Sequence, residues 1–209
     1  MKLLLLSLTF TSLLVLIPVS AEAKTYENDK YTIEYPNGCK LESKENRFSS
    51  TDVILECTGD AGFQFESSAQ ISESLAGSSD DDLVETMESV IDSVYDNAAI
   101  FETGTDKYIV NNKTAPYIIA TYDQEFSNAF GFTKIEPYVI MTVVVKLQDD
   151  EMILAQYRNN EDDFDKQLPM AEKIFQSVEP VSSLTEDTTE SSDSIAQGLF
   201  YYLNDISFS

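Results

Sequence analysis

The segment YVIMTVVV, residues 138–145, constrains the fold more than any other part of the chain. It is an eight-residue run of β-branched and other apolar residues that hardly alternates with polar ones. A strand that shows no alternation is covered on both of its faces, as in the centre of a sheet. The run therefore predicts a sheet with a packed layer on either side.

Shorter segments on both sides of this run also have strand character. The predicted strands are 31–35, 39–43, 52–57, 62–66 continuing towards Ile71, 99–102, 107–110, 117–122 and 152–157. Turn residues separate them at 36–38, 111–113 and 149–150, which favours antiparallel neighbours. Residues 72–79 are expected to form a polar loop, and residues 126–133 a loop with aromatic packing.

Two amphipathic helices are expected. Ser79 has the character of an N-cap, and Asp80, Asp81 and Asp82 in the first turn suit the helix dipole. The apolar positions of this helix are Leu83, Met87, Val90, Ile91, Val94 and Tyr95.

The second helical region opens at 161–164, and Pro169 fits a first-turn position. Met170, Ala171, Ile174, Phe175 and Val178 line one face, and Pro180 ends it. Strands and helices together predict an α+β fold, an antiparallel β-sheet flanked by helices. The acidic groups at 80–82, 149–150 and 161–163 then have structural explanations and do not require a metal site.

The N-terminus has the pattern of a secretory signal. Lys2 precedes a largely apolar stretch from Leu3 to Val19, and Ala21-Glu22-Ala23 follows with small residues where signal peptidase requires them. We expect a signal peptide over 1–23 and a secreted, extracytoplasmic protein. An uncleaved N-terminal membrane anchor is the alternative, although the apolar run is slightly short for a spanning helix.

The charge is strongly acidic, with 13 Lys and Arg against 37 Asp and Glu and a formal net charge of −24. Such a surface repels phosphate backbones, so no nucleic-acid partner is expected. It favours basic partners or bound cations, and solubility in a salty exterior is the simpler explanation. Ca²⁺ is the one cofactor left open, since clustered carboxylates can hold it.

Cys39 and Cys57 lie at equal distances from a hairpin centred near residue 48, so they face each other across it. We predict a disulfide between them, which export would permit. Two free thiols are the alternative.

Histidine is absent from the whole chain. This excludes Ser-His-Asp and Cys-His catalysis and His-ligated zinc. No catalytic residue and no metal ligand is predicted. A carboxylate-based hydrolase remains as an alternative, but no pair stands out from the acidic background.

The remaining signals lie in a predicted turn and in the C-terminal tail. Asn112-Lys113-Thr114 is an N-glycosylation sequon, so Asn112 is a candidate acceptor. Residues 182–194 form an acidic Ser/Thr-rich linker beyond a domain at 24–181. Residues 195–209 are a short amphipathic segment, which either packs back on the domain or docks on a partner or a membrane surface.

Three motifs resemble the PsbP family, whose best-known members are extrinsic subunits of the oxygen-evolving photosystem. They are the tripeptide at 26–28, the segment YTIEYPNG at 31–38 and the helix AEKIFQS at 171–177. The resemblance extends over 26–180 and implies an α/β/α sandwich. Relatives commonly carry Trp after the Gly, where this chain has Cys39. The metal-binding residues of photosynthetic members are often histidines, so none carries over.

These observations predict an exported, non-catalytic, PsbP-like binding or assembly module. Its expected partner is an unidentified extracytoplasmic protein or membrane complex. Peripheral membrane association through 195–209 or through an uncleaved N-terminal segment is a further expectation. A Ca²⁺- or cation-binding accessory protein of a membrane complex is the alternative function.

Overall fold

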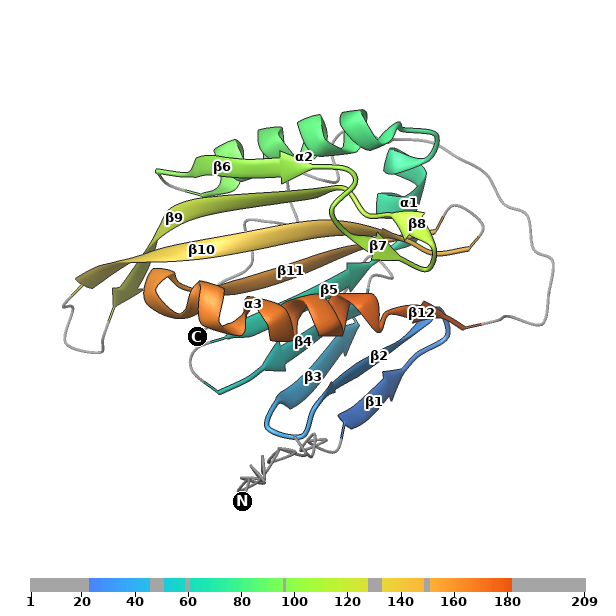
Figure 1. The fold of residues 1–209 in the computed structure, drawn as a ribbon, viewed down its shortest axis with the longest axis horizontal. Coiled ribbons are helices and arrows are strands. Elements are labelled where there is room, and N and C mark those ends of the chain that lie inside the picture. The colour runs from blue at the N-terminus through green and yellow to red at the C-terminus, as the bar shows by residue number, and fades with distance from the viewer. Residues whose placement is uncertain are drawn as a thin grey trace, which may run out of the picture.

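A computed structural model describes residues 23–45, 51–58, 61–95, 97–127, 133–148 and 151–181. Residues 1–22 of the predicted signal peptide at 1–23, and the tail 182–209, lie outside the described residues. A seven-stranded sheet with antiparallel pairing throughout forms the centre (Figure 1). In order across the sheet, the strands are β3 (Lys40–Glu45), β4 (Thr51–Glu56), β5 (Gly62–Ser67), β11 (Met152–Asn160), β10 (Thr133–Lys146), β9 (Tyr117–Ser127) and β6 (Ala99–Gly104).

Two smaller sheets accompany the large one. The first has the order β1-β2-β12, with β1 at Ala23–Glu27, β2 at Tyr31–Pro36 and β12 at Glu179–Pro180. The second is the hairpin of β7 (Ile109–Val110) and β8 (Lys113–Thr114). The structure is therefore a mostly antiparallel β-sheet protein with a few helices.

The predicted central strand is confirmed. Residues 138–145 of β10 are all buried between β9 and β11. Val139, Met141 and Val143 belong to the core on one face, and Ile140 and Val144 to the core on the other. Strands β9 and β10 extend beyond their predicted ends, so the expected loop at 126–133 is shorter, and residues 128–132 lie outside the described part.

Helix α2 (Asp80–Val94) begins where the sequence predicted. The Ser79 side chain accepts a hydrogen bond from the Asp82 N–H, and the Asp82 carboxylate accepts one from the Ser79 N–H, which completes a capping box. Leu83, Met87 and Ile91 are its buried residues.

The expectations of a strand towards Ile71 and of a loop from residue 72 were wrong over 69–75, because a short helix, α1 (Ala69–Leu75), follows β5 directly. Residues 76–79 lie outside any helix or strand, as expected for a loop. Ser68 caps α1 by accepting a hydrogen bond from the Ile71 N–H at 3.0 Å. Ile71 and Leu75 are one helical turn apart, and both are buried. Two apolar residues at this spacing are too few to reveal a helix in the sequence.

The position of Pro169 was also wrong. Helix α3 runs from Glu161 to Gln176, so the proline lies in its interior and not in its first turn. Asn160 caps the helix by accepting a hydrogen bond from the Asp163 N–H at 2.9 Å. Pro169 is exposed, so water can reach the carbonyl that a proline leaves without a helical hydrogen bond.

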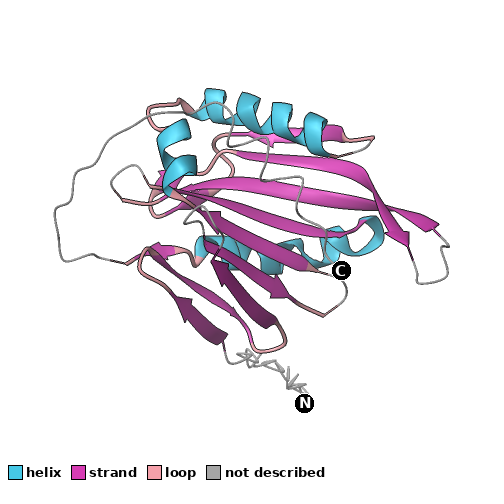
Figure 2. Ribbon diagram, turned by 180° about the vertical axis from the view of Figure 1, so that it is seen from behind, coloured by secondary structure: helices cyan, strands magenta, loops and turns pink. Residues whose placement is uncertain are grey.

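The large sheet has different neighbours on its two faces. On the front face, α3 and strand β2 enclose the larger core, in which Phe63, Tyr157 and Phe164 stack at ring-centroid distances of 5.0 and 4.9 Å. On the back face, α1 and α2 pack on β6, β9, β10 and the start of β11. Figure 2 shows no described helix over the backs of β3 and β4.

Candidate functional site

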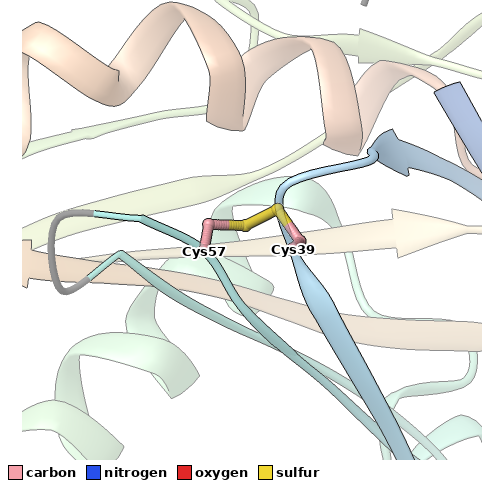
Figure 3. The surroundings of a disulfide bond; sticks show 2 residues. All are labelled: Cys39 and Cys57. Carbon is pink, nitrogen blue, oxygen red and sulfur yellow. A yellow bond between two sulfur atoms is a disulfide. The ribbon is translucent and has the colours of Figure 1, made fainter. Parts of the chain in front are cut away.

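The two cysteines form a disulfide in the structure, which agrees with the hairpin reasoning (Figure 3). Lys40 of β3 pairs with Glu56 of β4, so Cys39 and Cys57 follow as the next residues on each side. Their Cα atoms are 4.1 Å apart. Cys39 is buried, and Cys57 packs against the front core, which gives the bond a structural position.

Asn112 lies in the turn between β7 and β8. It is exposed and has a φ of 59°, a left-handed conformation that asparagine tolerates. Thr114 of the same sequon donates its hydroxyl to an Asp80 carboxylate oxygen. The acceptor side chain is therefore accessible, and its modification stays a prediction.

The three aspartates at the start of α2 have three different roles. Asp82 belongs to the capping box, and the Ser79 hydrogen bonds lower the pKa of its carboxyl. Asp80 pairs with Lys146 and Thr114; partial burial raises its pKa, but these hydrogen bonds outweigh burial and the net pKa is lowered. The remaining aspartate, Asp81, lines a surface depression.

This acidic depression lies between α2 and the end of β6 and has a volume of about 490 Å³. Asp81, Val84, Glu85 and Glu88 form a single stripe of α2, since they are spaced by about one helical turn. The opposite wall comprises Thr103, Gly104, Thr105 and Asp106. Four carboxylates therefore line the depression, and its lining includes no basic residue.

Lys107 directly follows Asp106 of the depression, but its ammonium group interacts with residues outside the lining. Its ammonium donates to Glu102 at 2.7 Å and lies 5.3 and 5.5 Å from the ring centres of Tyr108 and Tyr117. The hydrogen bond to Glu102 raises the pKa of Lys107 above its ordinary range. The depression can thus accept a cationic group from outside. Within the described ranges, no group of three or more possible ligands is placed to hold a metal ion, so the Ca²⁺ alternative gains no geometric support.

A buried glutamate, Glu66, was not predicted from the sequence. Glu66 of β5 is only 5% exposed, and its Oε1 has no hydrogen-bond partner. Burial, and secondarily the charge of Asp52 directly opposite on β4, raises its pKa to about 7. Phe63 and Phe65 face the front core, so the alternation of β5 already places Glu66 on the back face. Its burial there depends on tertiary contacts that no local pattern reveals.

No helix within the described ranges is both long and apolar enough to cross a membrane. The N-terminal segment, on which the anchor alternative depends, lies outside those ranges.

Comparisons with known proteins give weak structural similarity only. Cyanobacterial PsbP (CyanoP) from Synechocystis sp. PCC 6803 matches with a TM-score of 0.46 and 12% identity, over 77% of this chain and 94% of that one. LpqN, involved in cell envelope biogenesis of Mycobacterium tuberculosis, matches with a TM-score of 0.39 and 11% identity, over 76% and 90% of the two chains. No family model and no curated protein matches. Similarity at this level assigns neither a family nor a function.

Proposed function

We propose that the chain is an exported, non-catalytic binding or assembly module of the PsbP type, which engages a cationic group of an extracytoplasmic partner. The acidic depression between α2 and β6 carries this proposal. Three of its four carboxylates lie on α2 and the fourth, Asp106, lies in the bend after β6, and no basic residue in the lining neutralises them.

Other features support parts of the proposal. The N-terminal pattern and the Cys39–Cys57 disulfide are consistent with export. The missing histidines support a non-catalytic role. The PsbP-like motifs at 26–28, 31–38 and 171–177, with helices on both faces of an antiparallel sheet, support the PsbP-type sandwich.

Charge reversal in the depression tests the binding role. Asp81→Lys, Glu85→Lys and Glu88→Lys are combined in the chain from residue 24 to 209. The control combines Glu27→Lys, Asp29→Lys and Glu179→Lys, which makes the same change in net charge at exposed positions in the small sheet and in its β1–β2 turn.

Both variants and the wild-type chain are used as bait for the native envelope fraction at about 150 mM salt. At this ionic strength the Debye length is about 8 Å, so local charges dominate over the net charge. We expect the wild-type and control baits to retain the same partner and the α2 variant to lose it. Equal retention by all three baits would refute the role of the depression.

A further inference from the structure

The half of the back face formed by β4, β5 and β11 has an unusual combination of polarity and burial. The register places Ile54, Gln64, Gln156 and Thr142 in one row across neighbouring strands. Gln156 is 8% exposed and Thr142 is 3% exposed. Glu66 and Leu154 form the adjacent row. Gln156 donates to the Thr142 hydroxyl at 3.3 Å, and Glu66 is 5% exposed.

Of the strands β4, β5 and β11, only β11 makes main contacts with the helices of the back face. Helix α2 makes its sheet contacts with β6 and β9, and α1 makes its contacts with β11, where the Ser72 hydroxyl oxygen accepts the N–H of Met152. In Figure 2 neither helix lies across β4, the strand that carries Ile54. We call the area defined by Ile54, Gln64, Glu66, Leu154 and Gln156 the open back face.

We propose that the chain's own C-terminal segment, residues 195–209, docks on the open back face. The apolar positions of this segment recur at helical spacing: Ile195, Leu199, Tyr202, Leu203 and Ile206. Ile54 and Leu154 offer half-buried apolar surface to such a face. The hydroxyl of Tyr202 is the one hydrogen-bond donor among those five side chains, and the Glu66 Oε1 atom lacks a donor.

The length of the tail permits this contact. The described domain ends at Val181, whose N–H donates to the Lys30 carbonyl at 2.9 Å. The expected linker at 182–194 could span up to about 43 Å if extended. A domain of this size has a radius of gyration of about 15 Å. The linker can therefore reach either face of the sheet, and the short tether gives the segment a millimolar effective concentration.

Charge favours this occupant over a second copy of the chain or an acidic membrane. The linker carries Glu186, Asp187, Glu190 and Asp193, whereas the segment itself contains the single acidic residue Asp205. A second copy would bring another net charge of −24 and would be repelled.

Hydrogen exchange followed by mass spectrometry on residues 24–209 tests the proposal. We expect the amides of 199–206 to exchange at least tenfold more slowly than those of a free synthetic peptide of residues 195–209. Leu199→Asp with Leu203→Asp removes this protection, because it places charge on the apolar face. Tyr201→Asp, which helical spacing places opposite the apolar positions, leaves the protection unchanged.

Variants on the domain identify the docking surface. Ile54→Asp and, separately, Gln64→Lys abolish the protection of 199–206, whereas Ile135→Asp, at an exposed position of β10, does not. Circular dichroism confirms that each variant is folded, and two separate variants guard against the misfolding of one. The proposal is overturned if 199–206 exchange at the rate of the free peptide. It is equally overturned if protection persists in both folded open-face variants, or if it appears only after phosphatidylglycerol vesicles are added.

Discussion

At the scale of single residues, Glu66 stands out because a carboxyl group that is normally charged and hydrated is buried here. The Glu66 side chain, on the interior strand β5, is only 5% exposed to solvent. Its Oε1 atom has no hydrogen-bond partner. Burial and the facing Asp52 raise its pKa from an ordinary 4.5 to about 7. Folded protein therefore binds this proton more tightly than unfolded chain between those two pH values.

This shift makes stability depend on pH. Because the folded pKa is raised, the free energy of unfolding falls as pH rises from about 4.5 to about 7 and then levels off. The Glu66→Gln substitution removes this loss. We therefore expect the stability difference between the variant and the wild-type protein to favour the variant by about 1–3 kcal/mol more at pH 8 than at pH 4. Urea unfolding at both pH values measures the difference. Glu56→Gln, an exposed change on the same sheet face, is the control, and equal pH profiles for the two variants would contradict the prediction.

At the scale of elements, α3 contains its own destabilising residue. Pro169 interrupts the hydrogen bonding of a helix that otherwise has an Asn160 cap, an acidic first turn and a buried face. A proline inside a helix costs about 3 kcal/mol, and here exposure to water reduces that cost. The helix survives because Phe164, Ala171 and Phe175 pack into the front core on both sides of the proline.

Replacing the proline should therefore stabilise the protein. We expect Pro169→Ala to raise the free energy of unfolding by about 1–2 kcal/mol, after allowance for the greater freedom of the unfolded chain. Chemical denaturation monitored at 222 nm gives this value. Gln176→Ala, at an exposed position of the same helix, should change it by less than about 0.5 kcal/mol. A destabilised Pro169→Ala protein would mean that the proline adds something beyond local helix geometry.

At the scale of the whole molecule, the disulfide connects two parts of the architecture. Cys39 lies between β2 of the small sheet and β3 at the edge of the large sheet, and Cys57 follows β4. The bond therefore fixes the path by which the chain leaves the small sheet. The chain-entropy model attributes about 3 kcal/mol to a loop of this size.

The double substitution Cys39→Ser with Cys57→Ser should lower the free energy of unfolding by about 3 kcal/mol. Reduction of the wild-type protein by dithiothreitol should produce a loss of similar size, since it breaks the same cross-link without a change of sequence. Thermal and urea unfolding under both conditions provide the test. Unchanged stability after complete reduction would show that the cross-link does not constrain the unfolded chain.

Local chemistry in the sequence was enough to predict the central strand at 138–145, the capped start of α2 and the facing cysteines. Each depends on periodicity, capping or hairpin symmetry within a short stretch of chain. Tertiary structure alone decided that 69–75 form a helix, because their two apolar residues become a helical face only against β11. It also decided that Glu66 is buried and that Asp81 joins Asp106 in one depression. The helix at 69–75, the burial of Glu66 and the depression all depend on contacts between segments that are distant in the sequence. A local sequence pattern does not determine which distant segments come into contact.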